Sequence, residues 1–246
     1  MNKKIIRGKL NYQLLKIFPK NYNLMVSLNN GIRFILRSRT MDRTVLKEVW
    51  VREIYNRHGI CVEKGDTVLD VGGHIGIFSV YSAFRSQTGM VYVFEPFIEN
   101  FERIEKHAQM NHLNNVKAFH KGVTAKTGEM TLFLSPDNNT GGHSMHLKNE
   151  SEQRIKIQTV NLKEFCTEQK IKTIDFLKMD CEGAEFEILN GDKSILKKVK
   201  KIIMECHPYE DNTCDSMVAL LEESGFSVAR EGDTIGGVEM LYAIKK

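Results

Sequence analysis

The chain of 246 residues alternates short apolar runs with longer stretches in which apolar positions recur at helical spacing. The runs that predict strands of the main fold lie at 67–71, 90–95, 116–123, 174–180, 201–206, 226–230 and 237–244. The stretches that predict helices lie at 75–86, 98–111, 161–170, 184–199 and 213–224. Strands that alternate with helices form a parallel sheet covered by helices. We therefore predict an α/β fold whose sheet is mostly parallel, with an antiparallel end.

The first sixty residues follow a different pattern. Apolar-rich runs at 23–28 and 32–37 flank Asn29-Asn30-Gly31, which is a strong signal for a hairpin turn. Apolar positions over 43–58 recur at helical spacing, and Gly59 would end that helix. No stretch with the composition of a flexible linker separates these residues from the rest of the chain. We predict an N-terminal extension or cap over residues 1–60 on a main domain over residues 61–246.

A second irregular region interrupts the main fold. The alternating runs at 130–134 and 155–160 predict an antiparallel pair of strands, and they bracket a polar loop at 135–149. Long loops in compact domains often serve as functional lids. His143 lies in this loop within Gly141-Gly142-His143, where it could contact a substrate or simply face solvent.

Composition and charge restrict the possible classes of protein. Hydrophobic residues make up 41% of the chain and charged residues 27%, as in a globular protein, and no apolar run reaches the length of a membrane span. Five cysteines without paired spacing favour free thiols and a cytoplasmic location. Residues 1–60 carry 13 Lys and Arg against 3 Asp and Glu, a net charge of +10, whereas the rest carry 22 against 28, a net charge of −6. Such a basic region suits a solvated surface, an anionic glycan, a membrane surface or nucleic acid.

The turn after the first strand of the main fold indicates a cofactor site. The run 67–71 contains Asp70 and is followed by Gly72-Gly73-His74-Ile75-Gly76, and nineteen residues after Gly76 the next apolar run ends in Glu95. This order of strand, tight turn, helix, strand and acid is typical of sites for adenosine-bearing cofactors, in which the acid binds the ribose hydroxyls. Glycine lets the backbone approach a ligand where a Cβ would collide.

The residues of the turn favour one cofactor over others. A dinucleotide fingerprint needs glycine at position 71, where this chain has Val71. Asp70 would repel a pyrophosphate but suits a cofactor with an ammonium group and no phosphates, which favours S-adenosylmethionine over nicotinamide or flavin cofactors. Pro96 would then flank the adenine, and the backbone at Gly122 would lie near the adenine edge. The alternative is a glycine-rich turn that binds nothing, which leaves Glu95 unexplained.

Candidate catalytic residues lie at the ends of the fourth and fifth strands of the main fold. Lys178, Asp180 and Glu182 share one face if the strand stays extended, and Glu205 and His207 share one face of the next strand. Ligands bind at this edge of an open α/β sheet, and clustered charges perturb each other's pKa. A structural ion-pair cluster is the alternative. The cysteines and histidines lack the paired spacing of a zinc site, so we predict no metal.

Four segments together resemble the FkbM family of S-adenosylmethionine-dependent methyltransferases. They are Asp70–Gly76, Phe94-Glu95-Pro96, the block Lys178-Met179-Asp180-Cys181-Glu182-Gly183-Ala184-Glu185, and Met204-Glu205-Cys206-His207. The resemblance covers residues 43 to 230. It implies a Rossmann-like class I methyltransferase sheet of seven strands with the last strand antiparallel, and O-methylation of a hydroxyl, often on a sugar or natural product. It also implies that the block at 178–185 lies beside the reactive methyl group. This chain has Gly73 and His74 where the family commonly has Ala and Asn.

These observations lead to one functional prediction and two alternatives. We predict an S-adenosylmethionine-dependent O-methyltransferase that acts on a hydroxyl of a sugar, glycoconjugate or related metabolite. Asp180, His207, Lys178 and Glu182 are the candidate catalytic residues, with Asp180 favoured over His207 as the base, and His143 and Glu205 are the candidate substrate contacts. The alternatives are an RNA methyltransferase, favoured only by the basic first region, and a non-catalytic module that binds the cofactor. The chain lacks a segment of the N-P-P-[YF] type after the fourth strand, which disfavours a nucleic-acid substrate.

Overall fold

A seven-stranded sheet runs through the centre of the computed structural model, which describes residues 5–246 apart from 8, 136–138, 147–152 and 233–236. Its strands, in spatial order, are β12 (Phe226–Gly232), β13 (Glu239–Lys245), β11 (Val199–Cys206), β10 (Ile174–Met179), β4 (Val68–Val71), β5 (Val91–Phe94) and β6 (Val116–Phe119). The strands from β11 to β6 are parallel, whereas β13 pairs antiparallel with both β11 and β12. The predicted α/β sheet, mostly parallel with an antiparallel last strand, is confirmed.

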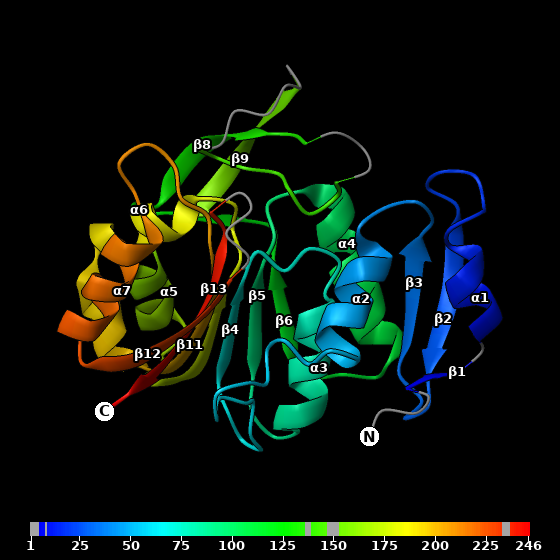
Figure 1. The fold of residues 1–246 in the computed structure, drawn as a ribbon, viewed down its shortest axis with the longest axis horizontal. Helices are drawn as coiled ribbons and strands as arrows, with labels where there is room; N and C mark the ends of the chain where they lie inside the picture. The colour runs from blue at the N-terminus through cyan, green and yellow to red at the C-terminus, as the bar shows by residue number, and fades with distance from the viewer. Residues whose placement is uncertain (1–4, 8, 136–138, 147–152, 233–236) are drawn as a thin grey trace.

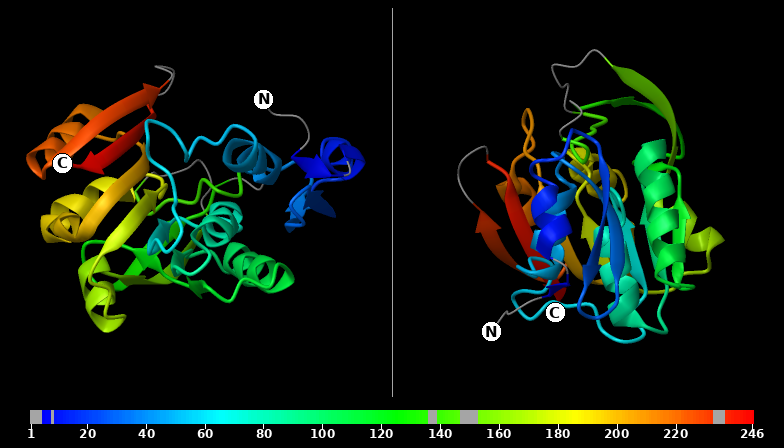
Figure 2. Two further views of the ribbon diagram at one scale, coloured as in Figure 1. Left: turned by 90° about the horizontal axis from the view of Figure 1, so that it is seen from below. Right: turned by 90° about the vertical axis from the view of Figure 1, so that its right-hand side faces the viewer.

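Helices cover both faces of this sheet, as Figures 1 and 2 show. They are α3 (Ile77–Ser86), α4 (Ile98–Met110), α5 (Leu162–Glu168), α6 (Ala184–Gly191) and α7 (Cys214–Glu223). Successive residues of β4 face opposite sides of the sheet, so Leu69 and Val71 join the core formed with α5, α6 and α7, whereas Val68 joins the core formed with α3. Every residue of β4 is buried, which explains why the strand reads as a continuous apolar run interrupted only by Asp70.

The N-terminal extension forms a small unit at one end of the molecule (Figures 1 and 2). It consists of β1 (Ile6–Arg7), α1 (Lys9–Leu14), β2 (Asn23–Leu28), β3 (Arg33–Arg37) and α2 (Asp42–Trp50). The predicted hairpin is confirmed, because β2 and β3 pair antiparallel, but β1 and α1 were not predicted. The ring of Phe34 contacts Trp50 of α2 and His107 of α4, so the extension packs on the main fold through a shared core. A domain boundary after residue 60 remains a prediction.

Two predicted helices are shorter than expected. The helix predicted over 43–58 ends at Trp50, and the following chain turns at Glu53 and His58, whose φ angles are 49° and 53°. Those left-handed backbones cannot continue a helix. The helix predicted over 184–199 ends at Gly191, and Asp192 then accepts a hydrogen bond from the amide of Ser194 to begin a separate 3-10 helix over Lys193–Lys198.

The strand predicted over 116–123 is wrong, because it is two strands in different sheets. The chain leaves β6 at Phe119, and the amide of Lys121 donates to the carbonyl of Phe119 in a tight turn. Residues Gly122–Val123 form β7, which pairs with β9 (Arg154–Val160) instead of the central sheet. β9 also pairs antiparallel with β8 (Gly128–Phe133), which confirms the predicted antiparallel pair. This three-stranded sheet carries the segment that contains His143 to the carboxyl edge of the central sheet.

Candidate functional site

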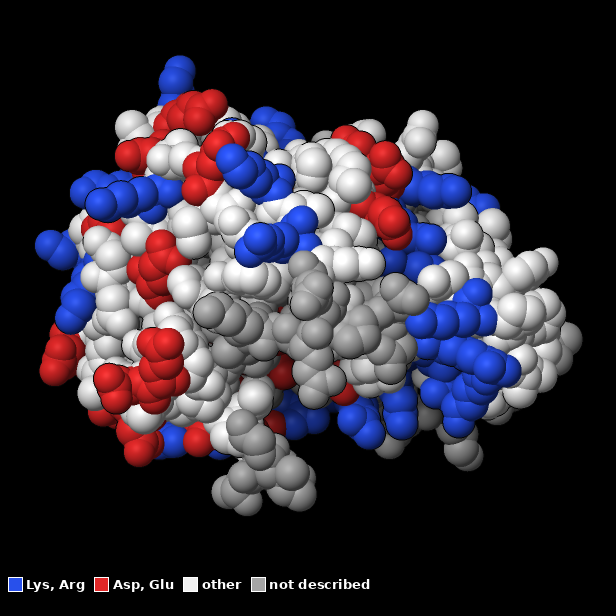
Figure 3. Space-filling model, turned by 90° about the horizontal axis from the view of Figure 1, so that it is seen from above, with Lys and Arg blue, Asp and Glu red and all other residues white. Residues whose placement is uncertain are grey.

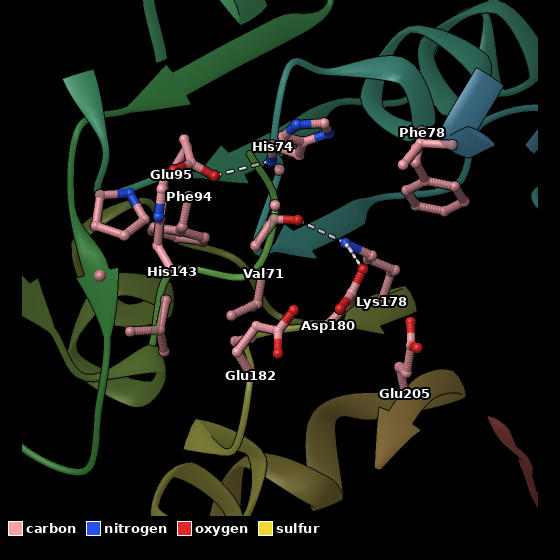
Figure 4. Close-up of a pocket in the computed structure, with 18 of the residues that line it drawn as sticks. Val71, His74, Phe78, Phe94, Glu95, His143, Lys178, Asp180, Glu182 and Glu205 are labelled. Atoms are coloured by element: carbon pink, nitrogen blue, oxygen red, sulfur yellow. Dashed lines mark hydrogen bonds and ion pairs between the residues drawn. The ribbon is translucent and has the colours of Figure 1, made fainter. Parts of the chain in front are cut away.

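A cavity of about 240 Å³ opens at the carboxyl edge of the central sheet, between the glycine turn, the ends of β10 and β11, and α2. Eleven of the residues predicted from the sequence line it: Gly72, Gly73, His74, Glu95, Pro96, Gly122, His143, Lys178, Asp180, Glu182 and Glu205. The other three, Asp70, Gly76 and His207, lie outside this lining. The topology therefore brings most of the candidate residues to one place, as Figure 4 shows for those it labels.

The glycine turn is shaped by close contacts within the protein. The amides of Gly72 and Gly73 donate to the carbonyl of Phe94 at 3.1 and 2.9 Å, which fixes the turn to the end of β5. A Cβ at Gly72 would lie 1.8 Å from the carbonyl oxygen of Asp180, and the φ angle of Gly72 is +81°. Glycine is required here because the backbone of the neighbouring strand end passes against it, whereas the sequence had suggested the approach of a ligand. Gly76 begins α3 and packs on Ile104, so its role is also in packing.

Glu95 is held by the turn that it faces. Its Oε2 accepts a hydrogen bond from the amide of His74 at 2.8 Å (Figure 4), and its Oε1 accepts one from the amide of Phe97 at 2.9 Å. Burial raises the pKa of Glu95 to about 7, and these two amide hydrogen bonds oppose the shift. The carboxylate is therefore fixed in position at the edge of the cavity, where the sequence predicted the ribose acid.

The side chain of His74 joins a polar network that ties the extension to the turn. Its Nε2 lies 3.0 Å from the hydroxyl of Thr140, 3.3 Å from Arg37 and 3.4 Å from Asp42. Arg37 and Asp42 form a buried ion pair at 2.9 Å, and Arg37 also donates to Asn100 of α4. Burial lowers the pKa of His74 to about 4, with Asp42 opposing the shift. This neutral ring connects the extension, the turn and the segment at residue 140.

Lys178 is a structural cation at the centre of the strand ends. Its Nζ donates to the carbonyl of Gly72 at 2.6 Å and lies 3.3 Å from Asp70 and 3.5 Å from Asp180. Burial alone lowers the pKa of Lys178, but Asp70 and Asp180 outweigh it and raise the pKa above its ordinary value. Lys178 therefore stays protonated, which removes it as a candidate base. Asp70 is fully buried and accepts a further hydrogen bond from Ser79 of α3, so it fixes Lys178 from beneath the cavity.

Three carboxylates gather on the side of the cavity opposite Glu95 (Figure 4). Asp180 and Glu182 follow β10, and Glu205 lies near the end of β11. The negative charge of Asp180 and burial raise the pKa of Glu205 to about 8, and burial raises the pKa of Glu182 to about 7. The carboxylate of Glu205 has no hydrogen bond or ion pair with any residue that the structure describes. Because the charge of Asp180 repels a second negative charge, Glu205 keeps a proton near neutral pH and can exchange it with a ligand.

His207 is not a suitable base. Its Nδ1 lies 3.3 Å from Glu185, its Nε2 lies 3.6 Å from Glu182, and the ring is outside the cavity lining. Burial alone would lower the pKa of His207, but the hydrogen bond and charge of Glu185, with Glu182, raise it to about 10. Glu185 itself is fully buried and accepts from the amides of Cys181 and Gly183. His207 is therefore a cation that orients Glu182 near neutral pH.

His143 lines the cavity beside Phe97, with ring centroids 4.5 Å apart. Its Nδ1 accepts a hydrogen bond from the amide of Ser135 at 3.0 Å, which places the ring proton on Nε2. Nε2 is buried and has no partner within the described part of the chain. Burial lowers the pKa of His143 to about 4, so the neutral ring offers one donor to a ligand. The rest of the predicted loop is only partly described, since 136–138 and 147–149 lie outside the described residues.

Residues of the N-terminal extension also line the cavity, which the sequence did not reveal. They are Met41, Val45, Glu48, Val49 and Tyr55. Tyr55 is 5% exposed and its hydroxyl makes no hydrogen bond to the described residues. Burial, Asp180 and Glu205 all raise the pKa of Tyr55. No local signal marks these positions, because the packing of α2 against α3 brings them to the cavity.

A metal ion has one candidate set of ligands in the described residues. Ligand atoms of Asp180, Glu205 and His207 lie within 4.8 Å of one another. However, both ring nitrogens of His207 face carboxylates, so the ring would have to lose a proton to coordinate a cation. The set therefore suits hydrogen bonding and proton exchange better than metal coordination.

The sheet order and the glycine turn with its buried acid define a Rossmann-like methyltransferase fold. Residues 70–228 match the model of the methyltransferase FkbM domain, and the chain belongs to this family of methyltransferases. The resemblance drawn from its motifs is thereby confirmed.

Three relatives show the range of proteins that the chain resembles. It is 28% identical over 252 residues to the AMB antimetabolite synthetase AmbE of Pseudomonas aeruginosa, a match that covers 86% of this chain but only 12% of that protein. It is 25% identical to the 31-O-demethyl-FK506 methyltransferase FkbM of Streptomyces tacrolimicus, over 77% of this chain and 83% of that one. It is 25% identical to the hexuronic acid methyltransferase AglP of Haloferax volcanii, over 66% and 67% of the two chains.

Proposed function

We propose that the protein transfers a methyl group from S-adenosylmethionine to a hydroxyl of a sugar, glycoconjugate or related metabolite. The observation that supports this most is the composition of the cavity. One side carries the glycine turn with a fixed acid, and the other carries Asp180 and Glu205, which can take up a proton. A donor site and an acceptor site within one small cavity are what a direct methyl transfer requires.

The residues of the turn fit this cofactor. Glu95 would hold the ribose hydroxyls, and Gly72 and His74 would border the methionine part, with Asp70 beneath them. Pro96 and Gly122 would border the adenine. The cofactor supplies an electrophilic methyl group on a sulfonium, and the carboxylates of the cavity balance that positive charge. The buried but unpartnered Nε2 of His143 is available to either ligand.

The chemistry that the protein supplies is alignment and removal of a proton. An acceptor hydroxyl must lose its proton as it is methylated, and a base with a pKa near the working pH removes it best. Asp180 and Glu205 form that base, since their mutual repulsion raises the pKa of Glu205 to about 8. Lys178 and His207 hold the strand ends in position as cations and take no proton. Tyr55, which lines the same cavity, would donate to the acceptor.

Relatives support a small hydroxyl-bearing acceptor. The names of two of them describe a methyltransferase of 31-O-demethyl-FK506 and a methyltransferase of hexuronic acid. A nucleic-acid acceptor has no comparable support. Side chains of α2 and of the segment at 139–145 line the cavity outside the glycine turn. These two segments would therefore select the acceptor.

The test has a binding part and a transfer part. S-adenosylmethionine or its demethylated product should raise the melting temperature, adding about 2.7 kcal/mol of stability at 100 times the dissociation constant, whereas NAD and ATP should not. Methyl-labelled cofactor incubated with glycan and metabolite fractions of a cell extract should then label a small hydroxyl compound. Equal stabilisation by NAD would contradict the cofactor. Transfer only to RNA would support an RNA methyltransferase, and binding without any transfer would support a non-catalytic module.

A further inference from the structure

Two segments of the N-terminal extension meet near the mouth of the cavity. The amide of Arg39 donates to the carbonyl of Leu15 at 2.9 Å, and the Arg39 guanidinium donates to the carbonyl of Ile17 at 3.2 Å. The amide of Tyr22 donates to the hydroxyl of Ser38 at 3.0 Å. We call the resulting surface the basic tip, formed by Lys16, Ile17, Lys20, Tyr22, Arg39 and Met41.

The basic tip exposes large apolar side chains to water. Ile17 is 66% exposed, Tyr22 51% and Met41 38%, and Met25 on the adjoining strand β2 is 45% exposed. Three further large hydrophobic residues are exposed in the described part of the chain, at positions 84, 98 and 244, and all three lie outside the N-terminal extension. A local concentration of exposed apolar side chains marks a surface that contacts a partner.

The charged residues of the basic tip are all of one sign. The first 41 residues of the sequence contain no Asp or Glu. Lys16, Lys20 and Arg39 are exposed at the basic tip. Viewed from above, Lys and Arg side chains gather at the end of the molecule that carries the N-terminal hairpin, beside an uncharged outer surface (Figure 3). The partner that complements this tip must be anionic.

We propose that the basic tip docks on the surface of a bilayer that contains anionic phospholipids. Lys and Arg are attracted to the negative surface potential of such a membrane, and Tyr and aliphatic side chains insert at the boundary between headgroups and acyl chains. A nucleic acid or a soluble anionic glycan would satisfy the charges but would leave Ile17 and Met25 in water. The combination of charge and exposed aliphatic surface therefore favours the membrane.

The position of the tip gives docking a consequence for the enzyme. Met41 belongs to the tip and also lines the cavity, so a docked protein holds the cavity mouth close to the bilayer. Acceptors carried at the membrane surface would then reach the site more readily than acceptors in solution. This consequence rests on the proposed function, whereas the docking itself does not.

The test uses the full chain and vesicles of defined composition. Protein should co-sediment with vesicles of phosphatidylcholine and phosphatidylglycerol but not with phosphatidylcholine alone, and binding should weaken as salt is raised. Each basic side chain near an anionic surface contributes about fivefold to partitioning, so Lys16→Glu combined with Lys20→Glu should lower it about 25-fold or more. Ile17→Ser combined with Tyr22→Ser should lower it about tenfold.

Matched controls keep the test specific to the tip. Lys170→Glu combined with Lys172→Glu makes the same change of charge at exposed positions that precede β10, at the opposite edge of the sheet, and should bind as the wild type does. Ile244→Ser removes an exposed aliphatic side chain elsewhere, and melting curves check that each variant is folded.

Equal binding to neutral vesicles, or tip variants that bind as the controls do, would overturn the proposal. Binding to a single-stranded RNA homopolymer without binding to vesicles would overturn it in favour of a polyanion. None of these results depends on methyl transfer.

Discussion

The two sides of the cavity differ in how their polar groups are bonded. On the turn side, formed by Gly72, Gly73 and Glu95, the polar groups bond to the protein itself: both oxygens of Glu95 accept from backbone amides, and the glycine amides donate to Phe94. On the carboxylate side, formed by Asp180, Glu182 and Glu205, charges of one sign face each other and Glu205 has no partner among the described residues. The turn side is organised before a ligand arrives, and the carboxylate side is left to react with one.

This difference separates binding from chemistry. The amides that hold Glu95 and the glycine turn determine where a ligand lies, and both oxygens of Glu95 are already occupied by them. Crowded carboxylates exchange protons readily, because ionising one raises the pKa of the next. We therefore expect changes on the turn side to alter affinity or folding, and changes on the carboxylate side to alter turnover.

The largest expected effect is on catalysis. Asp180→Asn keeps the shape and most hydrogen bonding but cannot accept a proton, so turnover should fall about a hundredfold to ten-thousandfold while cofactor still binds. Turnover with labelled cofactor and binding by calorimetry measure the two effects separately. His207→Gln is the control, and because His207 is a cation outside the cavity lining it should lose less activity. A larger loss for His207→Gln would reverse the assignment of the base.

The next effect tests the turn side through folding. Gly72→Ala places a Cβ 1.8 Å from the Asp180 carbonyl at a φ of +81°, so it should destabilise the protein by about 3 kcal/mol or more. Gly73→Ala meets side chains instead of backbone, with its Cβ 2.4 Å from Cγ1 of the buried Val93 and 3.0 Å from Cδ1 of Ile104, and should cost about 1–3 kcal/mol. Denaturant unfolding compares the two variants. Equal losses would show that the strand end moves freely against the turn.

Glu95 tests binding on the turn side without changing the backbone. Glu95→Ala should weaken cofactor binding by about 1.5–3 kcal/mol, because it removes charge-assisted hydrogen bonds to the ribose. Calorimetry with the demethylated cofactor measures the change. Glu95→Gln is the matched variant and should lose less, since the amide can still accept one hydrogen bond. Unchanged affinity in both variants would mean that Glu95 serves only to fix the amides of His74 and Phe97.

The sequence predicts the turn side better than the rest, for a physical reason. The turn and Glu95 depend on local order within some thirty residues, where apolar periodicity and glycine positions indicate strand, turn and helix directly. The carboxylate side depends on which strands become neighbours, so the sequence places Asp180 and Glu205 at strand ends but does not show that Glu185 makes His207 a cation. Contacts between distant segments, such as that of Tyr55 with the cavity, leave no periodic signal. The split of 116–123 into β6 and β7 was likewise hidden, because both halves are apolar enough to be strands.

The smallest expected effect concerns pH and distinguishes a pair of carboxylates from a single base. The charge of Asp180, with burial, raises the pKa of Glu205 to about 8, so the pair should lose its shared proton as the pH rises through that value. Turnover at saturating substrates should therefore be about tenfold lower at pH 7 than on the plateau above pH 9, since a base with that pKa is about one-tenth deprotonated at pH 7. Glu205→Gln removes the carboxyl group whose pKa is about 8, so the rise in turnover between pH 7 and pH 9 should disappear. If the pH profile of turnover keeps its midpoint in Glu205→Gln, another group takes the proton. Proton transfer could then no longer be assigned to the carboxylate side of the cavity.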